Sequence, residues 1–212
     1  MALSKSEKLD LVRQAKIIAI MRAQQSTQML TAAEAIHAGG VCVIEVTMTT
    51  PGALELIIEA TQRFGDRVLF GAGSVLDAET ARLAILAGAG FIVAPTLSLP
   101  VIQMCIRYSI PVMPGCYTPT ECLTAWEAGA DMIKLFPADV GGPDFVKAIL
   151  APMPQLEIVP VGGVTIDNVG EFMIKGATAV GIGSSLINQT LVEQGKFAEL
   201  TRRAREFMEA IE

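Results

Sequence analysis

The stretches HAGGVCVIEV (37–46), LAGAGFIVAP (86–95), EAGADMIKLF (127–136) and IKGATAVGIG (174–183) repeat one pattern along the chain. Each begins at the end of an amphipathic segment, passes through glycine and enters an apolar run. Glycine at such a point is typical of a helix C-terminus, where a residue with left-handed backbone geometry ends the helix. The pattern therefore predicts repeated helix-to-strand connections.

The same reading extends to eight apolar strand cores. They are IIAIM (17–21), VCVIEV (41–46), RVLFGA (67–72), FIVAP (91–95), IPVMP (110–114), DMIKLF (131–136), EIVPV (157–161) and AVGIG (179–183). Strands that are apolar throughout and joined by helical crossovers are typical of parallel sheets. The count of eight favours an α/β fold of the (β/α)₈ TIM-barrel type, with an open doubly wound sheet as the alternative.

The two ends of the chain carry further helical patterns. Residues 4–14 are predicted to form an extra N-terminal helix, and residues 190–211 one long final helix. A chain of 212 residues has the size of one large domain, and no linker or low-complexity stretch suggests a second module. We expect a single domain over residues 1–212.

Composition argues against several functional classes. Lys and Arg number 16 against 22 Asp and Glu, which leaves a net charge of -6 and no basic face for a nucleic acid. Mean hydropathy is high, at +0.49, but the apolar runs are much shorter than the roughly 20 residues that span a bilayer. The first residues carry charges and lack the apolar core of a secretory signal. A cytoplasmic protein with no membrane or nucleic-acid partner is expected.

The cysteines and the histidine offer little metal chemistry. The four cysteines have no CxxC spacing, and Cys42 and Cys105 lie in apolar segments where a free thiol acts as a small hydrophobic group. The single histidine, His37, lies near the end of a predicted helix. This count excludes a Ser-His-Asp triad and most histidine-built metal sites. We expect neither a metal nor a cofactor.

Lys134 is the lysine that lies inside an apolar strand core, near the C-terminal end where barrel active sites are found. Partial burial lowers the pKa of an amine and leaves a neutral nucleophile that can attack a ketone. Glu45 lies near the end of another even-numbered strand, and inward residues of such strands share layers, so the two should face each other. A carboxyl group there can move protons during imine chemistry. A solvated lysine or a purely structural ion pair is the alternative.

Glycine-rich segments follow the last two predicted strands and are candidates for a phosphate site. They are VGGV (161–164) and GIGSS (181–185), which includes Gly183. Glycine lets backbone N–H groups approach an anion, although tight packing turns would look the same. GAGS (71–74) could similarly bind a substrate carboxylate. The guanidinium group of Arg22 could bind an anion, and Phe136 could form an apolar wall beside the lysine.

Six motifs, in this order and spacing, resemble those of the KDPG/KHG aldolases, the 2-keto-3-deoxy-6-phosphogluconate and 4-hydroxy-2-oxoglutarate aldolases. They are IEVTMTTPGA (44–53), GAGSVLDAET (71–80), MPGCYTPTE (113–121), IKLFPAD (133–139), PVGGV (160–164) and GIGSSL (181–186). The resemblance implies a (β/α)₈ class I aldolase, usually trimeric and metal-free, that makes pyruvate from a phosphorylated keto acid. It covers essentially the whole chain.

Carried over by motif, the resemblance implies that Lys134 is the Schiff-base lysine and Glu45 the acid/base. The implied substrate-lining residues are Gly73, Ser74 and Pro95 around the pyruvate half, and Gly162, Gly163 and Ser184 around the phosphate.

Two positions depart from many gluconate-type members. Thr49 stands where they carry an Arg that helps hold the substrate carboxylate, for which Arg22 is the candidate substitute. Val161 stands where they carry Thr, close to the sugar hydroxyls. A galactonate-type 6-phosphate substrate, or a broad specificity that includes hydroxyoxoglutarate, therefore stays open. Two alternatives have other functions. One is a phosphate-binding barrel isomerase or epimerase, which would form no covalent adduct. The other is a ligand-binding barrel without catalytic activity.

Overall fold

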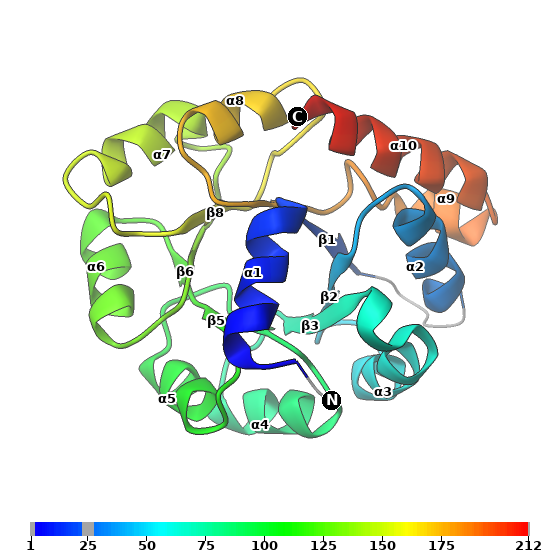
Figure 1. Cartoon of the computed structure of the whole chain (residues 1–212), viewed down its shortest axis with the longest axis horizontal. Helices are drawn as coiled ribbons and strands as arrows, with labels where there is room; N and C mark the ends of the chain where they lie inside the picture. Colours follow the sequence, from blue (N-terminus) through cyan, green and yellow to red (C-terminus); the bar gives the residue numbers. More distant parts are fainter. Residues whose placement is uncertain (1–2, 23–27, 212) are drawn as a thin grey trace.

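The computed structural model describes residues 3–22 and 28–211. Figure 1 shows parallel strands that curl around the centre of the molecule, with helices covering their outer side. The strands are β1 (Ile17–Met21), β2 (Val43–Thr47), β3 (Leu69–Gly73), β4 (Ile92–Val93), β5 (Val112–Met113), β6 (Gly115–Cys116), β7 (Ile133–Leu135), β8 (Ile158–Pro160) and β9 (Val180–Ile182). Each predicted strand core overlaps one of them.

Two parallel sheets are formed, one in the order β5-β4-β3-β2-β1-β9 and one in the order β6-β7-β8. β5 and β6 lie on either side of Pro114 and pair with different strands. β5 pairs with β4, and β6 pairs with β7. At the other side, β8 meets β9 through a bridge between Val161 and Gly181. Because the paired strands are parallel, their C-terminal ends and the loops after them gather at one face.

The repeated glycines end their helices as the sequence predicts. Gly40, Gly88, Gly129 and Gly176 all have φ between 92° and 105°. The residue after each glycine donates its N–H to a helix carbonyl five positions earlier, as Ala130 does to Ala125 at 3.0 Å. This is the Schellman arrangement. It also explains why β2, β4, β7 and β9 begin one or two residues later than predicted, since the first residues after each glycine still belong to the turn.

A ring of helices surrounds the strands. They are α2 (Met29–Ala38), α3 (Ala53–Phe64), α4 (Ala78–Leu86), α5 (Leu99–Arg107), α6 (Pro119–Glu127), α7 (Gly142–Leu150), α8 (Val169–Ile174), α9 (Gln189–Glu193) and α10 (Phe197–Ala210), with a 3-10 turn at Gly65–Arg67. The expectation of one long final helix is wrong: Gly195 adopts φ 65° and separates α9 from α10. No helix in the described ranges is both long and apolar enough to cross a membrane.

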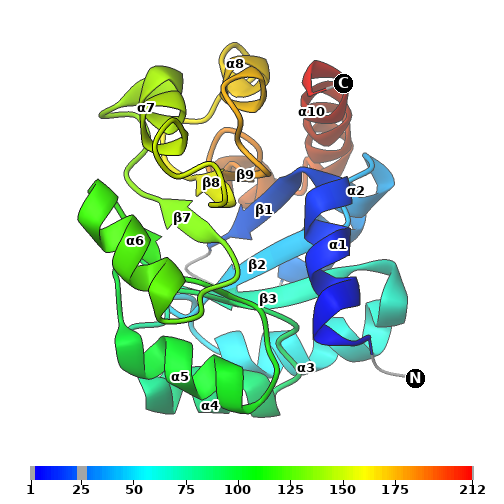
Figure 2. The same cartoon turned by 60° about the vertical axis from the view of Figure 1, so that its left-hand side comes forward.

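α1 (Lys5–Ala15) precedes β1 and lies across one end of the strands, as the two views in Figures 1 and 2 agree. Its buried Leu9 and Val12 pack with Phe91 in the cluster of side chains enclosed by the strands, the inner core. The outer core is the apolar layer between the strands and the surrounding helices. Arg13 forms an ion pair with Glu157, just before β8, at 2.7 Å. The helix therefore closes the N-terminal end of the strands and leaves the C-terminal end as the mouth of the interior.

Candidate active site

Lys134 lies on β7 and is 6% exposed. Its neighbours Ile133 and Leu135 belong to the outer core beneath the helices, so the alternation of a strand directs Lys134 to the interior. Its Nζ lies 4.9 Å from the centroid of the Phe136 ring. Burial lowers the pKa of this amine; the negative charge of Glu45 opposes that effect, and the positive charge of Arg22 adds to it. The amine is thus biased toward its neutral, nucleophilic form.

Glu45 lies on β2 and is 2% exposed. Ile44 and Val46 pack in the outer core, so this carboxyl group also faces the interior. Burial raises its pKa, while the charges of Lys134 and Arg22 lower it. Each of the two groups therefore acts on the ionisation of the other, as expected from their strand positions. A carboxyl group with a raised pKa can both donate and accept a proton near neutral pH.

Gly73 provides the space that the Glu45 side chain occupies. It ends β3 and pairs with Thr47 of β2. A Cβ at this position would lie 1.6 Å from Oε1 of Glu45, far inside any contact distance. Glycine at position 73 is therefore a steric requirement for the observed carboxyl position, in addition to the substrate-lining role implied by the resemblance.

Three further predicted residues lie at the ends of β2, β3 and β4. Ser74 follows Gly73 with φ 57°, an uncommon conformation for a residue with a side chain and one often found at functional sites. Pro95 lies against Gly115, which pairs with Lys134 in the β6–β7 register. Thr49 is exposed, and its hydroxyl lies 3.1 Å from that of Thr47.

A cavity of about 320 Å³ opens at the ends of β1, β8 and β9. Neither Lys134 nor Glu45 lines it, but Arg22, whose charge acts on both groups, does. Six predicted residues line it: Arg22, Val161, Gly162, Gly163, Gly183 and Ser184. Val164, Gly181 and Ser185 also line it and belong to the predicted VGGV and GIGSS segments, whereas Ile20, Ile187 and Gln189 were not predicted. The glycine-rich segments after β8 and β9, separate in the sequence, thus form adjoining walls of one cavity.

Local hydrogen bonds fix both glycine-rich segments. After β8, the Asn168 side chain accepts from the N–H of Thr165 at 2.8 Å and donates to the carbonyl of Gly163 at 2.9 Å. After β9, the carbonyl of Gly183 accepts from the N–H groups of Leu186 and Ile187 at 3.0 and 2.8 Å. These bonds hold the turns in a defined shape, and N–H groups at such turns can bind an anion. Arg22 adds a positive charge to the cavity wall.

Two residues beside the pair were not singled out from the sequence: Thr47, buried on β2, and Gly115, which pairs with Lys134. Thr47 could have been found, because it lies two residues from Glu45 and therefore on the same face of the strand. Gly115 had no signal of its own, since its contact with Pro95 depends on strand pairing.

A buried amine with a lowered pKa, a carboxyl group with a raised pKa and a cavity walled by glycine-rich turns are the features expected of lysine-dependent aldolases. The comparisons agree with this class. The profile of the KDPG and KHG aldolase family matches residues 9–203. The chain belongs to the KDPG and KHG aldolase family.

Relatives of both substrate types match along nearly the whole chain. The 2-dehydro-3-deoxy-phosphogluconate aldolase of Pseudomonas aeruginosa is 31% identical over 208 residues, which cover 97% of this chain and 94% of the relative. The 2-dehydro-3-deoxy-6-phosphogalactonate aldolase of Escherichia coli is 32% identical over 195 residues, covering 89% and 95%. The KDPG aldolase of Legionella pneumophila, solved with pyruvate as a covalent carbinolamine, superposes with a TM-score of 0.89 at 27% identity, covering 95% of this chain and 98% of that one.

Proposed function

We propose that this chain is a class I aldolase that cleaves a 2-keto-3-deoxy-6-phospho sugar acid to pyruvate and glyceraldehyde 3-phosphate. The observation that carries the proposal is the buried pair Lys134 and Glu45, together with a cavity walled by glycine-rich turns whose Arg22 acts on the charge of both groups. The names of the relatives give the substrate class.

In the proposed mechanism, the neutral amine of Lys134 attacks the C2 ketone of the substrate and forms a carbinolamine. Loss of water gives an imine, which acts as the electron sink for the next step. Glu45 takes the proton of the C4 hydroxyl as the C3–C4 bond breaks, and the aldehyde leaves. The remaining enamine is protonated at C3, and water hydrolyses the resulting imine to pyruvate and free lysine. A single buried carboxyl group can serve both proton transfers.

The substrate would lie along the mouth with its two anionic ends apart. We place the keto acid half near Gly73, Ser74 and Pro95, with Phe136 as an apolar wall. The phosphate would occupy the cavity, against the turns that contain Gly162, Gly163, Gly183 and Ser184, and Arg22 would supply the positive charge.

The galactonate-type epimer is the second candidate substrate, with the same mechanism. Val161 lines the cavity and is buried, and its methyl group offers no hydrogen bond to a sugar hydroxyl. Relatives named for the gluconate and for the galactonate substrate match this chain about equally well. Initial rates with the two C4 epimers separate the candidates, since a ratio above about tenfold identifies the preferred one. Cleavage of 4-hydroxy-2-oxoglutarate to pyruvate and glyoxylate is a further activity to assay.

The remaining expectations concern the whole molecule. We propose that the strands close into an eight-stranded (β/α)₈ barrel with α1 as an extra N-terminal helix, supported by the Val161–Gly181 bridge and by the passage of β5 into β6. We also propose one catalytic domain over residues 1–212, acting in the cytoplasm without metal or cofactor as a homotrimer. The family resemblance supports the trimer, and light scattering of the purified protein tests it.

Trapping of the imine tests the proposed chemistry. The protein is incubated with pyruvate, reduced with borohydride and weighed intact, with Lys134→Ala as the control. One reduced pyruvyl group, mapped to Lys134 and absent from the control, is expected. If the folded protein gives no adduct, or if the adduct maps to another lysine, the proposal is wrong.

A further inference from the structure

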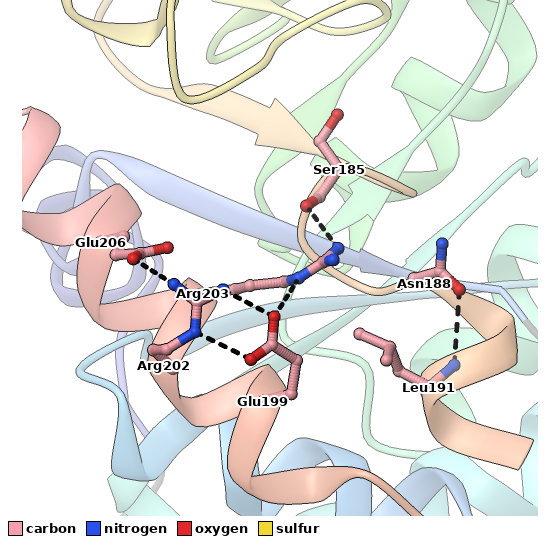
Figure 3. A network of polar contacts seen from close by, with 7 residues as sticks. All are labelled: Ser185, Asn188, Leu191, Glu199, Arg202, Arg203 and Glu206. Carbon is pink, nitrogen blue, oxygen red and sulfur yellow. Dashed lines mark hydrogen bonds and ion pairs between the residues drawn. The ribbon is translucent and has the colours of Figure 1, made fainter. Parts of the chain in front are cut away.

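A network on α10 reaches the loop that follows β9 (Figure 3). Glu199 accepts hydrogen bonds from Arg202, at 2.6 and 2.8 Å, and from Nε of Arg203 at 3.2 Å. These bonds hold the pKa of Glu199 down, at about 2, so the group stays ionised. The Nη1 atom of Arg203 extends to the carbonyl oxygen of Ser185 at 3.5 Å. Arg203 is thus held between a carboxylate of its own helix and a carbonyl of the loop.

The carbonyl that Arg203 contacts belongs to the peptide unit that closes the turn after β9. The C=O of Ser185 and the N–H of Leu186 share one planar peptide bond. That N–H closes the turn onto the carbonyl of Gly183 at 3.0 Å, with Ser184 and Ser185 at its central positions. Because the peptide is rigid, the guanidinium group on its outer side and Gly183 on its inner side together fix its orientation. Both serines line the cavity.

The far end of the same loop is fixed independently. The Asn188 side chain accepts from the N–H of Thr190 at 2.9 Å and from that of Leu191 at 3.4 Å, and so caps the start of α9. Figure 3 shows the contact with Leu191. The contact from Arg203 therefore acts on the middle of the loop, at Ser185, and can fix the orientation of the turn toward the cavity.

We infer that Arg203 is a positioning residue for the anion cavity: it holds the carbonyl of Ser185 and so fixes the turn that presents Ser184 to the phosphate of the substrate. This inference rests on the proposed function, because it takes the phosphate to bind in that cavity. Arg203 acts from behind the loop and touches neither the lysine nor the carbonyl carbon that reacts.

The chain contains a matched control in the neighbouring arginine. Arg202 lies on the same helix, shares Glu199 with Arg203 and pairs with Glu206. Its side chain is 55% exposed, against 31% for Arg203, and its ion-pair partners Glu199 and Glu206 both lie on α10. Loss of Arg202 therefore removes an arginine from the same network without removing the contact to the loop.

The test compares Arg203→Gln, Arg203→Lys and Arg202→Gln with the unchanged chain. We expect Arg203→Gln to raise KM for the phosphorylated substrate about five- to tenfold, with kcat within about twofold, because a charge-assisted contact that orders the binding turn is lost. KM for 4-hydroxy-2-oxoglutarate, which has no phosphate, should stay within about twofold of its original value. Arg203→Lys should recover part of the loss, and Arg202→Gln should resemble the unchanged chain.

Inorganic phosphate provides a readout that needs no turnover. Phosphate should raise the Tm of the unchanged chain and of Arg202→Gln, and the same concentration should raise that of Arg203→Gln less. Equal KM increases for both substrates, equal effects of the two arginine variants, or an undiminished phosphate effect in Arg203→Gln would each refute the inference. If the unchanged chain forms no pyruvate adduct, the proposed function fails, while the phosphate measurement still decides whether Arg203 orders an anion site.

Discussion

The substitution Gly73→Ala should disable proton transfer while leaving the lysine able to form its imine. The new Cβ would lie 1.6 Å from Oε1 of Glu45, and real Cβ atoms approach no closer than 3.0 Å, so the oxygen must move by at least 1.4 Å. A displacement of about 1 Å at a reacting group can cost about 100-fold in rate. We therefore expect the proton-exchange rate of bound pyruvate to fall about 100-fold or more. The displaced side chain should also cost about 1–3 kcal/mol of stability, as overpacking does.

The assay separates this steric effect from blockage of the substrate. Exchange of the pyruvate methyl protons with deuterated water reports on Glu45, and borohydride trapping reports on Lys134. In a double-mutant cycle, Glu45→Gln should slow exchange strongly in the unchanged chain but add little in Gly73→Ala, because both changes act through one carboxyl group. Additive effects of the two substitutions, or loss of the trapped adduct in Gly73→Ala, would falsify the steric explanation.

Other substitutions test the remaining parts of the site and fold. Glu45→Gln should slow pyruvate proton exchange at least about 100-fold while the adduct still forms, and an unchanged exchange rate would remove its acid/base role. Because burial lowers the pKa of Lys134 from 10.5, the neutral fraction of the amine and the trapping rate should increase with pH and level off below that value; a midpoint at or above 10.5 contradicts the assignment. Val161→Thr should shift the rate ratio of the two C4 epimers toward the gluconate type, and an unchanged ratio argues against a role in selectivity. Leu9→Ala, at the closed end of the strands, should lower the free energy of unfolding by about 2–3 kcal/mol in a denaturation series with kcat/KM unaffected; a large loss of kcat/KM would show that α1 also shapes the mouth.

The sequence predicted the repeated connections because their cause is local. A glycine with positive φ can be read from its place between an amphipathic segment and an apolar run, and Gly88 and Gly129 adopt that geometry. The strand starts were placed too early because apolar character does not distinguish a strand residue from one still bound to the preceding helix. The split of the fifth strand at Pro114 and the break at Gly195 likewise depend on pairing and backbone geometry that composition does not reveal.

The candidate site divides in the same way. Lys134 and Glu45 were predictable because an ionisable residue inside an apolar strand stands out without any structure. The steric role of Gly73 was not, because the side chain that needs its space belongs to the neighbouring strand. Arg203 gave no signal within its predicted helix, and only the folded chain brings it to the carbonyl of Ser185. An ionisable residue in an apolar strand can be predicted from the sequence, whereas a contact between distant segments cannot.

Burial affects the pKa values of Lys134 and Glu45 more than the charge of each group affects the other. For Lys134, burial lowers the pKa and outweighs the opposing charge of Glu45, and for Glu45 burial raises the pKa against the charges of Lys134 and Arg22. Both effects favour neutral groups, whereas a salt bridge would favour charged ones. The apolar core that α1 closes is therefore part of the chemistry, because burial is what lowers the pKa of the lysine and biases it toward its neutral, reactive form.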